Sequence, residues 1–228
     1  QRWCNIVTTS GSRDFNIDVG EIIEEAYERC GLEVRTGYDA KTARRSLNLM
    51  FADWANRGLN QWTIAEKNLT VVQGDGTYDL GTSTIDILSL VVRRDGTDYA
   101  LDRISRDEYL NIPTKSTTGR PTQYFVDRLI NPVLKMWPLP DNSTDVVYYD
   151  ALIRLDDADN YTNTLQVPFR FYPALAAGLA YYISIKRAPD RSQMLKSVYE
   201  EEIGRAMDED RDRASFRVAP DLRNYRYV

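Results

Sequence analysis

The sequence predicts an α+β protein: a discontinuous helical bundle with an inserted β-rich domain and an extended C-terminal arm. Apolar residues recur with helical spacing near both ends of the chain, and short β-rich runs separated by turn signals fill the middle. A single bundle with an insertion is the economical way to join two helical segments so far apart in sequence. The expected divisions are residues 17–61 and 168–213 for the bundle core, 62–167 for the β-rich inserted domain, 1–16 for an N-terminal extended segment and 214–228 for the C-terminal arm.

A first helix is predicted from about Val19 to Cys30. Asp18 and Glu21 have the spacing of a capping box, and Gly31 suits a left-handed helix stop. The apolar residues of this helix form one stripe: Val19, Ile22, Ile23, Ala26, Tyr27 and Cys30. Cys30 is therefore expected to be a small buried apolar residue and not a reactive thiol.

A second helix is predicted from about Ala40 to Asn56, with Gly58 as its stop. Ala43, Leu47, Met50 and Trp54 recur at spacings of four and three, which places them on one inward face. We expect Leu47, Met50 and Trp54 to be structural core. The remaining polar residues are expected to form a solvated face: Arg44, Arg45, Asn48 and Asp53.

Turn signals punctuate the β-rich block at Gly74-Asp75-Gly76, Asp95-Gly96 and Asn131-Pro132. The Asp95-Gly96 pair predicts a hairpin between strands at 85–94 and 98–103. A short helix is expected over 105–111, since Ser105 and Glu108 have capping-box spacing. Further strands are predicted at 123–129, 133–137 and 145–155.

Helical spacing returns after Pro168. The Ala-rich segment from Pro173 to Lys186 is apolar nearly all round, which predicts a buried central helix that neighbouring helices approach closely. Pro189 is expected to end it. A fourth helix is predicted from about Asp190, with one apolar face made of Leu195, Tyr199, Ile203 and Ala206.

The composition excludes several classes of function. The chain has 228 residues and no histidine, which rules out Ser-His-Asp and Cys-His catalysis and removes the commonest zinc ligand. Its net charge of −5 lacks the basic excess that holds nucleic acid. Two cysteines, Cys4 and Cys30, make no disulfide framework, so a reducing cytoplasm is the expected place of synthesis. The apolar run from Pro173 to Ile185 is too short to span a membrane.

Several other patterns resemble catalytic or ligand-binding motifs of other proteins, but in this sequence each is expected to have only a structural role. Gly74-Asp75-Gly76 lacks the spacing of a phosphate loop and is expected to be a turn. The loop with Asp156, Asp157, Asp159 and Asn160 lacks the EF-hand pattern for calcium. Glu200, Glu201 and Glu202 are consecutive, so their carboxylates diverge on a helix and are expected to be solvated. Three N-x-S/T triplets, at Asn68, Asn142 and Asn160, follow no recognisable signal peptide, so we expect no glycosylation. We expect no cofactor, no metal and no enzymatic activity.

The pattern L-N-x-M-x-x-x-W-x-x-x-G-L-x-x-W resembles the second helix of head-to-tail adaptor (connector, or head completion) proteins of short-tailed, podovirus-like phages. Here its letters are Leu47, Asn48, Met50, Trp54, Gly58, Leu59 and Trp62. Two later stretches resemble the β segment of those proteins: Gly119-Arg120-Pro121 with Tyr124, and the run from Leu134 through Pro138, Pro140 and Asp141 to Tyr148-Tyr149. The resemblance covers about residues 18–213.

This resemblance implies a structural virion protein at the head-tail junction, assembled in the host cytoplasm. Such adaptors form a ring, usually a dodecamer, between the portal protein and the tail (nozzle or tail tube) protein, and genomic DNA passes through the channel without sequence-specific binding. A dodecamer at −5 per chain would carry about −60, which repels the DNA backbone and lets it slide. No membrane is involved.

Adaptors of this family reach the portal through their C-terminal segments. The segment from Ala214 to Val228 is rich in Arg and Tyr, the residue types enriched at interface hot spots, and has no helical or strand period. We therefore expect it to order on the portal through Phe216, Arg217, Leu222, Arg223, Tyr225, Arg226 and Tyr227. The Asp95-Gly96 hairpin and the loop from Asn111 to Gly119 are expected to face a neighbouring subunit or the tail.

One alternative remains open from the residues. Aromatic residues in the β-rich block are also compatible with a carbohydrate- or protein-binding module carried on a helical stalk. The two hypotheses differ in a simple observable. An adaptor forms a closed ring with a portal protein, whereas a lectin-like module binds glycans alone and needs no ring.

Overall fold

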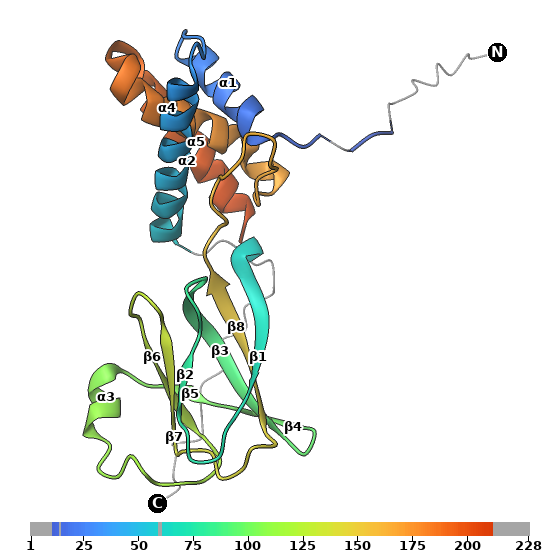
Figure 1. Ribbon diagram of the computed structural model, residues 1–228, viewed down its shortest axis with the longest axis vertical. Helices are drawn as coiled ribbons and strands as arrows, with labels where there is room; N and C mark the ends of the chain where they lie inside the picture. The colour runs from blue at the N-terminus through green and yellow to red at the C-terminus, as the bar shows by residue number, and fades with distance from the viewer. Residues whose placement is uncertain (1–10, 14, 59–60, 212–228) are drawn as a thin grey trace, which may run out of the picture.

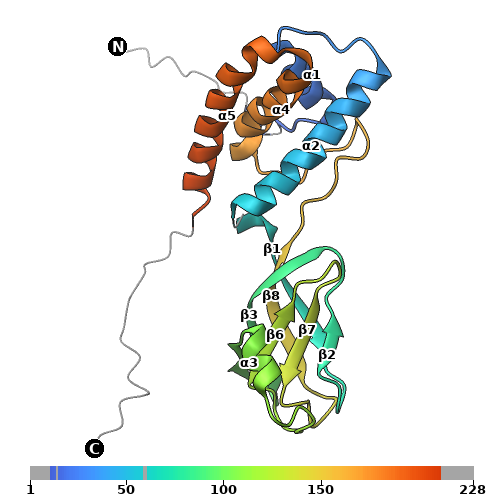
Figure 2. The ribbon, with the colours of Figure 1, turned by 90° about the vertical axis from the view of Figure 1, so that its left-hand side faces the viewer.

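The computed structural model describes residues 11–13, 15–58 and 61–211, which form an elongated α+β fold. Four of its helices gather at one end and two β sheets occupy the other, as Figures 1 and 2 show from two directions. The chain passes from the helices to the sheets and back again. The α+β prediction is therefore confirmed. The expected C-terminal arm and most of residues 1–16 lie outside the described residues.

The helical end consists of α1 (Val19–Arg29), α2 (Gly37–Arg57), α4 (Tyr172–Arg187) and α5 (Pro189–Glu209). The helix α4 lies in the middle and packs against the other three. Its alanines and Gly178 are buried, as its all-round apolar character predicts. Gly178 is a point of close approach, since an added Cβ would lie 2.5 Å from Met50 Sδ and 2.7 Å from a ring carbon of Tyr199.

Local capping explains where these helices begin and end. The capping box of Asp18 and Glu21 is present, and Gly31 has a φ of +69° just beyond α1. The helix α2 begins at Gly37, earlier than expected, because the side chain of Thr36 accepts the backbone N–H of Asp39 at 3.2 Å. Pro189 is the first residue of α5, where its missing N–H costs nothing.

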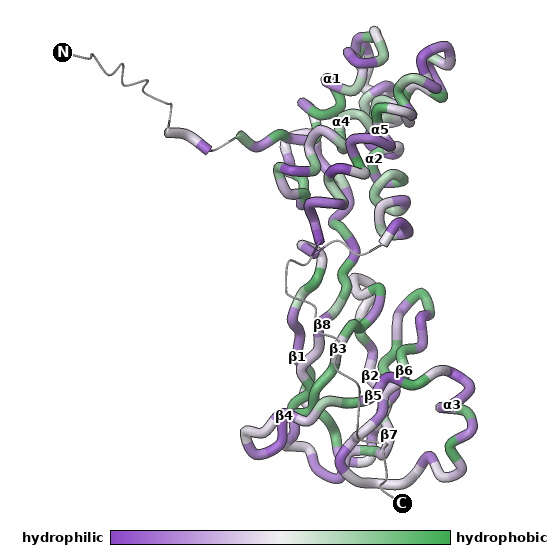
Figure 3. Tube along the Cα trace, turned by 180° about the vertical axis from the view of Figure 1, so that it is seen from behind, coloured by the Kyte–Doolittle hydropathy of each residue, from purple (hydrophilic) through white to green (hydrophobic). Residues whose placement is uncertain are grey.

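The other end is a sandwich of two four-stranded sheets. One sheet has the order β1-β8-β3-β4 and the other β2-β7-β6-β5. Apolar side chains from β3 and β8 of the first sheet and from β6 and β7 of the second form a shared core. Figure 3 shows the hydrophobic residues along β3 and β8. The strands are β1 (Ile64–Thr70), β2 (Thr77–Asp79), β3 (Thr84–Arg94), β4 (Thr97–Ala100), β5 (Asp102–Arg103), β6 (Gln123–Asp127), β7 (Val133–Trp137) and β8 (Val146–Ile153).

The predicted hairpin is present, but its second strand is shorter than expected. Asp95 and Gly96 both have positive φ, 52° and 78°, and join β3 to β4. The single strand expected over 98–103 is wrong, because Leu101 is buried in the sandwich core and the chain crosses there to the other sheet. The Leu101 N–H still bonds to Leu90 O at 3.1 Å, while the Asp102 N–H bonds to Thr122 O at 2.9 Å. The residues after Leu101 form β5, parallel to β6.

A short helix, α3 (Arg106–Asn111), lies beside the sheets with the predicted capping box of Ser105 and Glu108. The strands expected over 123–129 and 145–155 are each shorter at their ends than predicted. Within the part of the chain that the structure describes, no helix is both long enough and apolar enough to cross a bilayer.

Candidate interaction surfaces

The predicted core residues of α2 lie in the centre of the helical bundle. Leu47 and Met50 are fully buried and Trp54 is 2% exposed. The indole of Trp54 contacts Phe171, with ring centroids 5.6 Å apart. Its Nε1 donates a hydrogen bond to the hydroxyl of Tyr199 on α5 at 2.9 Å. Burial raises the pKa of Tyr199 above its ordinary range, so the hydroxyl stays a neutral acceptor for the indole.

A chain of polar contacts continues from Tyr199 to the surface and corrects two sequence expectations. The Tyr199 hydroxyl bonds to Asp53 at 3.3 Å, Asp53 pairs with Arg57 at 2.8 Å, and Arg57 makes a two-pronged contact with Glu200 at 2.8 and 2.9 Å. The Arg57 hydrogen bonds lower the pKa of Glu200. Asp53 and Glu200 are therefore not simply solvated. They link α2 to α5.

The polar face of α2 also holds the segment that returns from the sheets. Asn48 accepts the Ala158 N–H at 2.8 Å through Oδ1 and donates to Ala158 O at 3.4 Å. Arg44 donates to the backbone oxygen of Asp159. The expectation that Arg44 and Asn48 are only solvated is thus wrong, because the returning segment covers this side of the helix. Arg45 is exposed, as expected.

The helical and β ends meet around Asp210, whose side chain is 3% exposed. Its carboxylate accepts the backbone N–H of Gln61 at 2.8 Å and pairs with Arg170. The Arg170 guanidinium lies over the ring of Trp62, which packs on Phe171 with ring centroids 4.4 Å apart. Asp210 therefore ties the end of α5 to the point where the chain enters the sheets.

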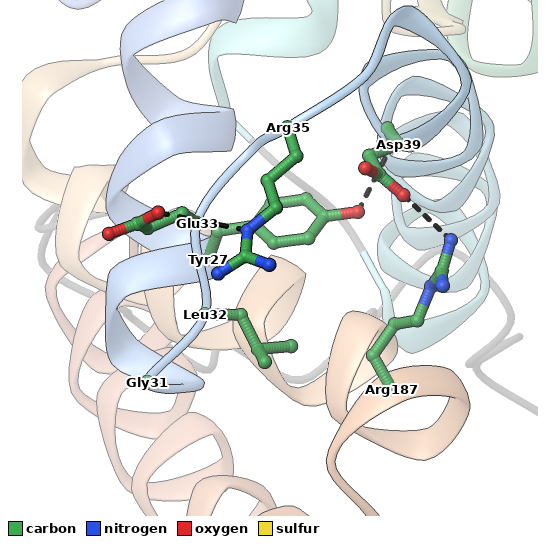
Figure 4. A pocket seen from close by; sticks show the side chains of 7 residues that line it. All are labelled: Tyr27, Gly31, Leu32, Glu33, Arg35, Asp39 and Arg187. Atoms are coloured by element: carbon green, nitrogen blue, oxygen red, sulfur yellow. Dashed lines mark hydrogen bonds and ion pairs between the residues drawn. The ribbon is translucent and has the colours of Figure 1, made fainter.

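The depression drawn in Figure 4 has no catalytic arrangement. It lies between the end of α1 and the start of α2 and is lined by Tyr27, Gly31, Leu32, Glu33, Arg35, Asp39 and Arg187. Arg187 pairs with Asp39 at 2.7 Å, and the Tyr27 hydroxyl donates to the backbone oxygen of Asp39 at 3.3 Å. The Thr36 hydrogen bond lowers the pKa of Asp39, and burial raises that of Tyr27. The charged groups are occupied with one another.

The other candidate chemical groups are also placed. Cys30 is buried as predicted, its Sγ 3.2 Å from Ala180 O, and burial raises its pKa. Cys4 lies outside the described residues. In the acidic loop Asp157 pairs with Arg154 at 2.5 Å. Among the described residues no three His, Cys, Asp or Glu side chains come together as a metal site. Gly74 has a φ of +78° in the turn between β1 and β2, and no helix follows it.

Two surface loops lie at the end of the sandwich away from the bundle (Figure 1). These are the β3–β4 hairpin and the loop from Asn111 to Gly119. Hydrogen bonds hold the second loop to neighbouring elements, since Trp137 Nε1 of β7 donates to Thr114 O at 3.0 Å and Lys115 Nζ donates to Leu110 O of α3 at 2.9 Å. The seven portal-binding residues expected between Phe216 and Tyr227 lie outside the described residues.

Comparison with known families decides the class of protein. Residues 17–221 match the SU10 adaptor protein family, which includes nearly all of the described chain. The chain belongs to this family. It is accordingly a phage head-to-tail adaptor, a structural component of the head-tail junction. A search of curated proteins found no match.

The polar residues that join distant segments could not be identified from the sequence. The adaptor's polar residues Asn48, Asp53, Glu200 and Asp210 all bridge segments more than a hundred residues apart. Their only signal in the sequence is a polar side chain in a helix or just beyond its end, which is equally typical of a solvated face. The spacing of residues along the chain does not predict their hydrogen-bond partners, which lie in distant segments.

Proposed function

We propose that this adaptor forms a ring, a dodecamer, between the portal protein and the tail of a short-tailed phage, with genomic DNA passing through its channel. The family match over residues 17–221 carries this proposal. The elongated shape supports it, because the helical bundle and the distal loops of the sandwich lie at opposite ends and are able to contact different components (Figure 1).

The C-terminal segment is the proposed portal anchor. Its Arg and Tyr side chains suit pairing with carboxylates and filling of apolar niches. The residues proposed to bind are Phe216, Arg217, Leu222, Arg223, Tyr225, Arg226 and Tyr227. The β3–β4 hairpin and the loop from Asn111 to Gly119 are proposed to face the tail or a neighbouring copy.

The proposed role of the ring toward DNA is passive. Twelve chains at −5 bring about −60, so the assembly as a whole repels the phosphate backbone. No covalent chemistry and no cofactor are required for this role. DNA is expected to pass without sequence-specific contacts.

The proposal is tested by mixing the purified chain with its cognate portal and counting symmetry in electron micrographs. Rings of the chain on the portal, and their absence for a chain truncated after Arg213 that melts like the full chain, are the expected results. Truncated chains that still form rings with unchanged affinity would assign docking to the bundle instead. A chain that binds glycans and forms no ring with the portal would favour the carbohydrate-binding module.

A further inference from the structure

The outer side of α2 carries a regular exposed stripe. Its residues follow one another at spacings of three and four, which places them on a single line along the helix. The α2 stripe consists of Tyr38, Lys41, Arg45, Leu49, Ala52 and Asn56, all exposed. Tyr38 is 66% and Leu49 56% exposed, and the stripe contains no carboxylate. Neither Lys41 nor Arg45 has an ion-pair partner within the described ranges. This is a basic surface with apolar side chains to cover.

The helix α5 carries an exposed stripe of the opposite charge. The α5 stripe consists of the exposed residues Met194, Val198, Glu201 and Arg205 and the half-buried Glu202. Met194 is 59% and Val198 39% exposed. Both carboxylates pair with the single guanidinium of Arg205, so the stripe keeps a net negative charge. It also offers apolar side chains to a partner.

The two stripes face away from each other across the bundle. Figure 2 shows α2 and α5 on opposite sides, both running toward the sheets. Glu200 bonds to Arg57 of α2 and so marks the side of α5 that faces α2. Val198 is two residues earlier, about 200° around the helix, and therefore lies on the outward side. A closed head-to-tail ring needs two different, complementary surfaces on opposite sides of each copy.

The order of side chains also matches over the first turns of the two stripes. On α2, Tyr38 precedes the cations Lys41 and Arg45 by one to two turns. On α5, Met194 and Val198 precede Glu201 in the same way. Copies related by rotation about the long axis of the molecule present these two helices running in the same direction. Tyr38 then meets Met194 and Val198, and the cations Lys41 and Arg45 meet Glu201 and Glu202, while Leu49 and Arg205 follow these groups on their own helices.

We propose that the α2 stripe of one copy docks on the α5 stripe of the next copy, and that this contact closes the ring. The inference rests on the proposed ring. It commits to a second copy of this chain as the occupant of both surfaces.

Two charge-reversed variants test the contact on the portal. One is Lys41→Glu with Arg45→Glu, and the other is Glu201→Lys with Glu202→Lys. Each variant alone places like charges across the contact and is expected to lose the rings that the wild type forms. An equimolar mixture is expected to restore them, because in an alternating ring every contact again joins opposite charges. Thermal melting of each variant shows that it is folded.

A matched control reverses Glu24 and Glu28 on the outer side of α1, with the same change in net charge as the α5 variant. Rings are expected to persist. The proposal is overturned if either α2 or α5 variant forms rings alone, or if the folded variants fail to restore rings when mixed. Loss of rings in the α1 control, with rescue by the α2 variant, would assign α1 as the partner surface instead.

If the wild-type chain forms no ring on the portal, the proposed function is overturned. That result alone does not test the contact between the two stripes. The contact is then tested on the free chain at high concentration with a carbodiimide, which joins amines to adjacent carboxylates. A bond between Lys41 of one copy and Glu201 or Glu202 of another supports it. The absence of such a bond overturns it.

Discussion

The indole Nε1 of Trp54 on α2 donates to the hydroxyl of Tyr199 on α5 across 2.9 Å, and the two residues are 145 positions apart in the chain. Both side chains are buried, at 2% and 1% exposure. The same hydroxyl reaches Asp53 and through it the Arg57–Glu200 pair. A continuous chain of polar contacts thus runs from the centre of the apolar bundle to its surface.

Tyr199→Phe is expected to lower the free energy of unfolding by about 1–3 kcal/mol, because the buried indole N–H loses its acceptor. Trp54→Ala is expected to cost about 3–5 kcal/mol, since a large ring leaves a cavity. Urea unfolding measures both. Tyr38→Phe is the control, because Tyr38 is 66% exposed. Equal stability of Tyr199→Phe and wild type would show that the hydrogen bond contributes nothing.

Gly178→Ala is expected to destabilise the bundle, although alanine is the better helix former by about 1 kcal/mol. The added Cβ would lie 2.5 Å from Met50 Sδ and 2.7 Å from the Tyr199 ring. Gly204→Ala is the matched control on α5, where nothing lies within 4 Å of an added Cβ. Calorimetry should show a lower melting temperature for Gly178→Ala and a higher one for Gly204→Ala. A rise for both would mean that α4 and α5 separate easily.

Asp210→Ala is expected to loosen the junction between bundle and sheets. The Gln61 N–H loses its acceptor, and Arg170 loses its carboxylate. We expect a loss of about 1–3 kcal/mol and faster hydrogen exchange at the Gln61 amide. Asp208→Ala is the control, since Asp208 is 69% exposed and pairs with Arg211 nearby. Unchanged exchange at Gln61 in the Asp210 variant would contradict this role.

The Arg57–Glu200 pair predicts a pH dependence of stability. Arg57 lowers the pKa of Glu200 in the folded chain, whereas an unfolded glutamate titrates near about 4.3. The stabilisation is therefore fully present above about pH 5 and lost as the pH falls through the folded pKa. Because Glu200 is 45% exposed, we expect a contribution of about 0.5–1 kcal/mol.

This dependence is measured as the difference in unfolding free energy between wild type and Glu200→Gln across pH 3 to 8. The difference should be constant near neutrality and shrink toward zero in acid. Glu24→Gln, on the exposed side of α1, is the control and should show no such change. A Glu200→Gln difference that stays constant down to pH 3 would rule out the ion pair as its cause.

Deleting Pro113 to Thr118 is expected to leave a folded chain that fails either in ring formation or in tail attachment. The loop lies at the far end of the sandwich (Figure 1), and loops displayed on a rigid scaffold commonly carry recognition. Electron microscopy of the assemblies shows whether rings and tails are present. A melting curve shows whether the shortened chain is folded. Assemblies that keep both ring and tail would remove this loop from the interface.

The sequence by itself determined the elements whose causes are local. The capping boxes at Asp18 and Ser105, the left-handed stop at Gly31 and the Asp95-Gly96 turn each depend on residues within a few positions of one another. The buried face of α2 with Leu47, Met50 and Trp54 likewise follows from helical spacing, and these residues are buried in the structure. Such patterns are legible because the interacting groups are neighbours in the chain.

Only the tertiary structure decided where the remaining polar groups find partners. Nothing near Asp53, Glu200 or Asp210 in the chain marks them as links between distant segments, and nothing near Leu101 shows that the chain changes sheets there. These outcomes depend on how two layers pack against each other. They also depend on each buried polar atom finding a hydrogen-bond partner, which can lie far away in the sequence. The same holds for the two outward stripes: each is readable as an exposed helix face, but only the folded bundle sets them on opposite sides.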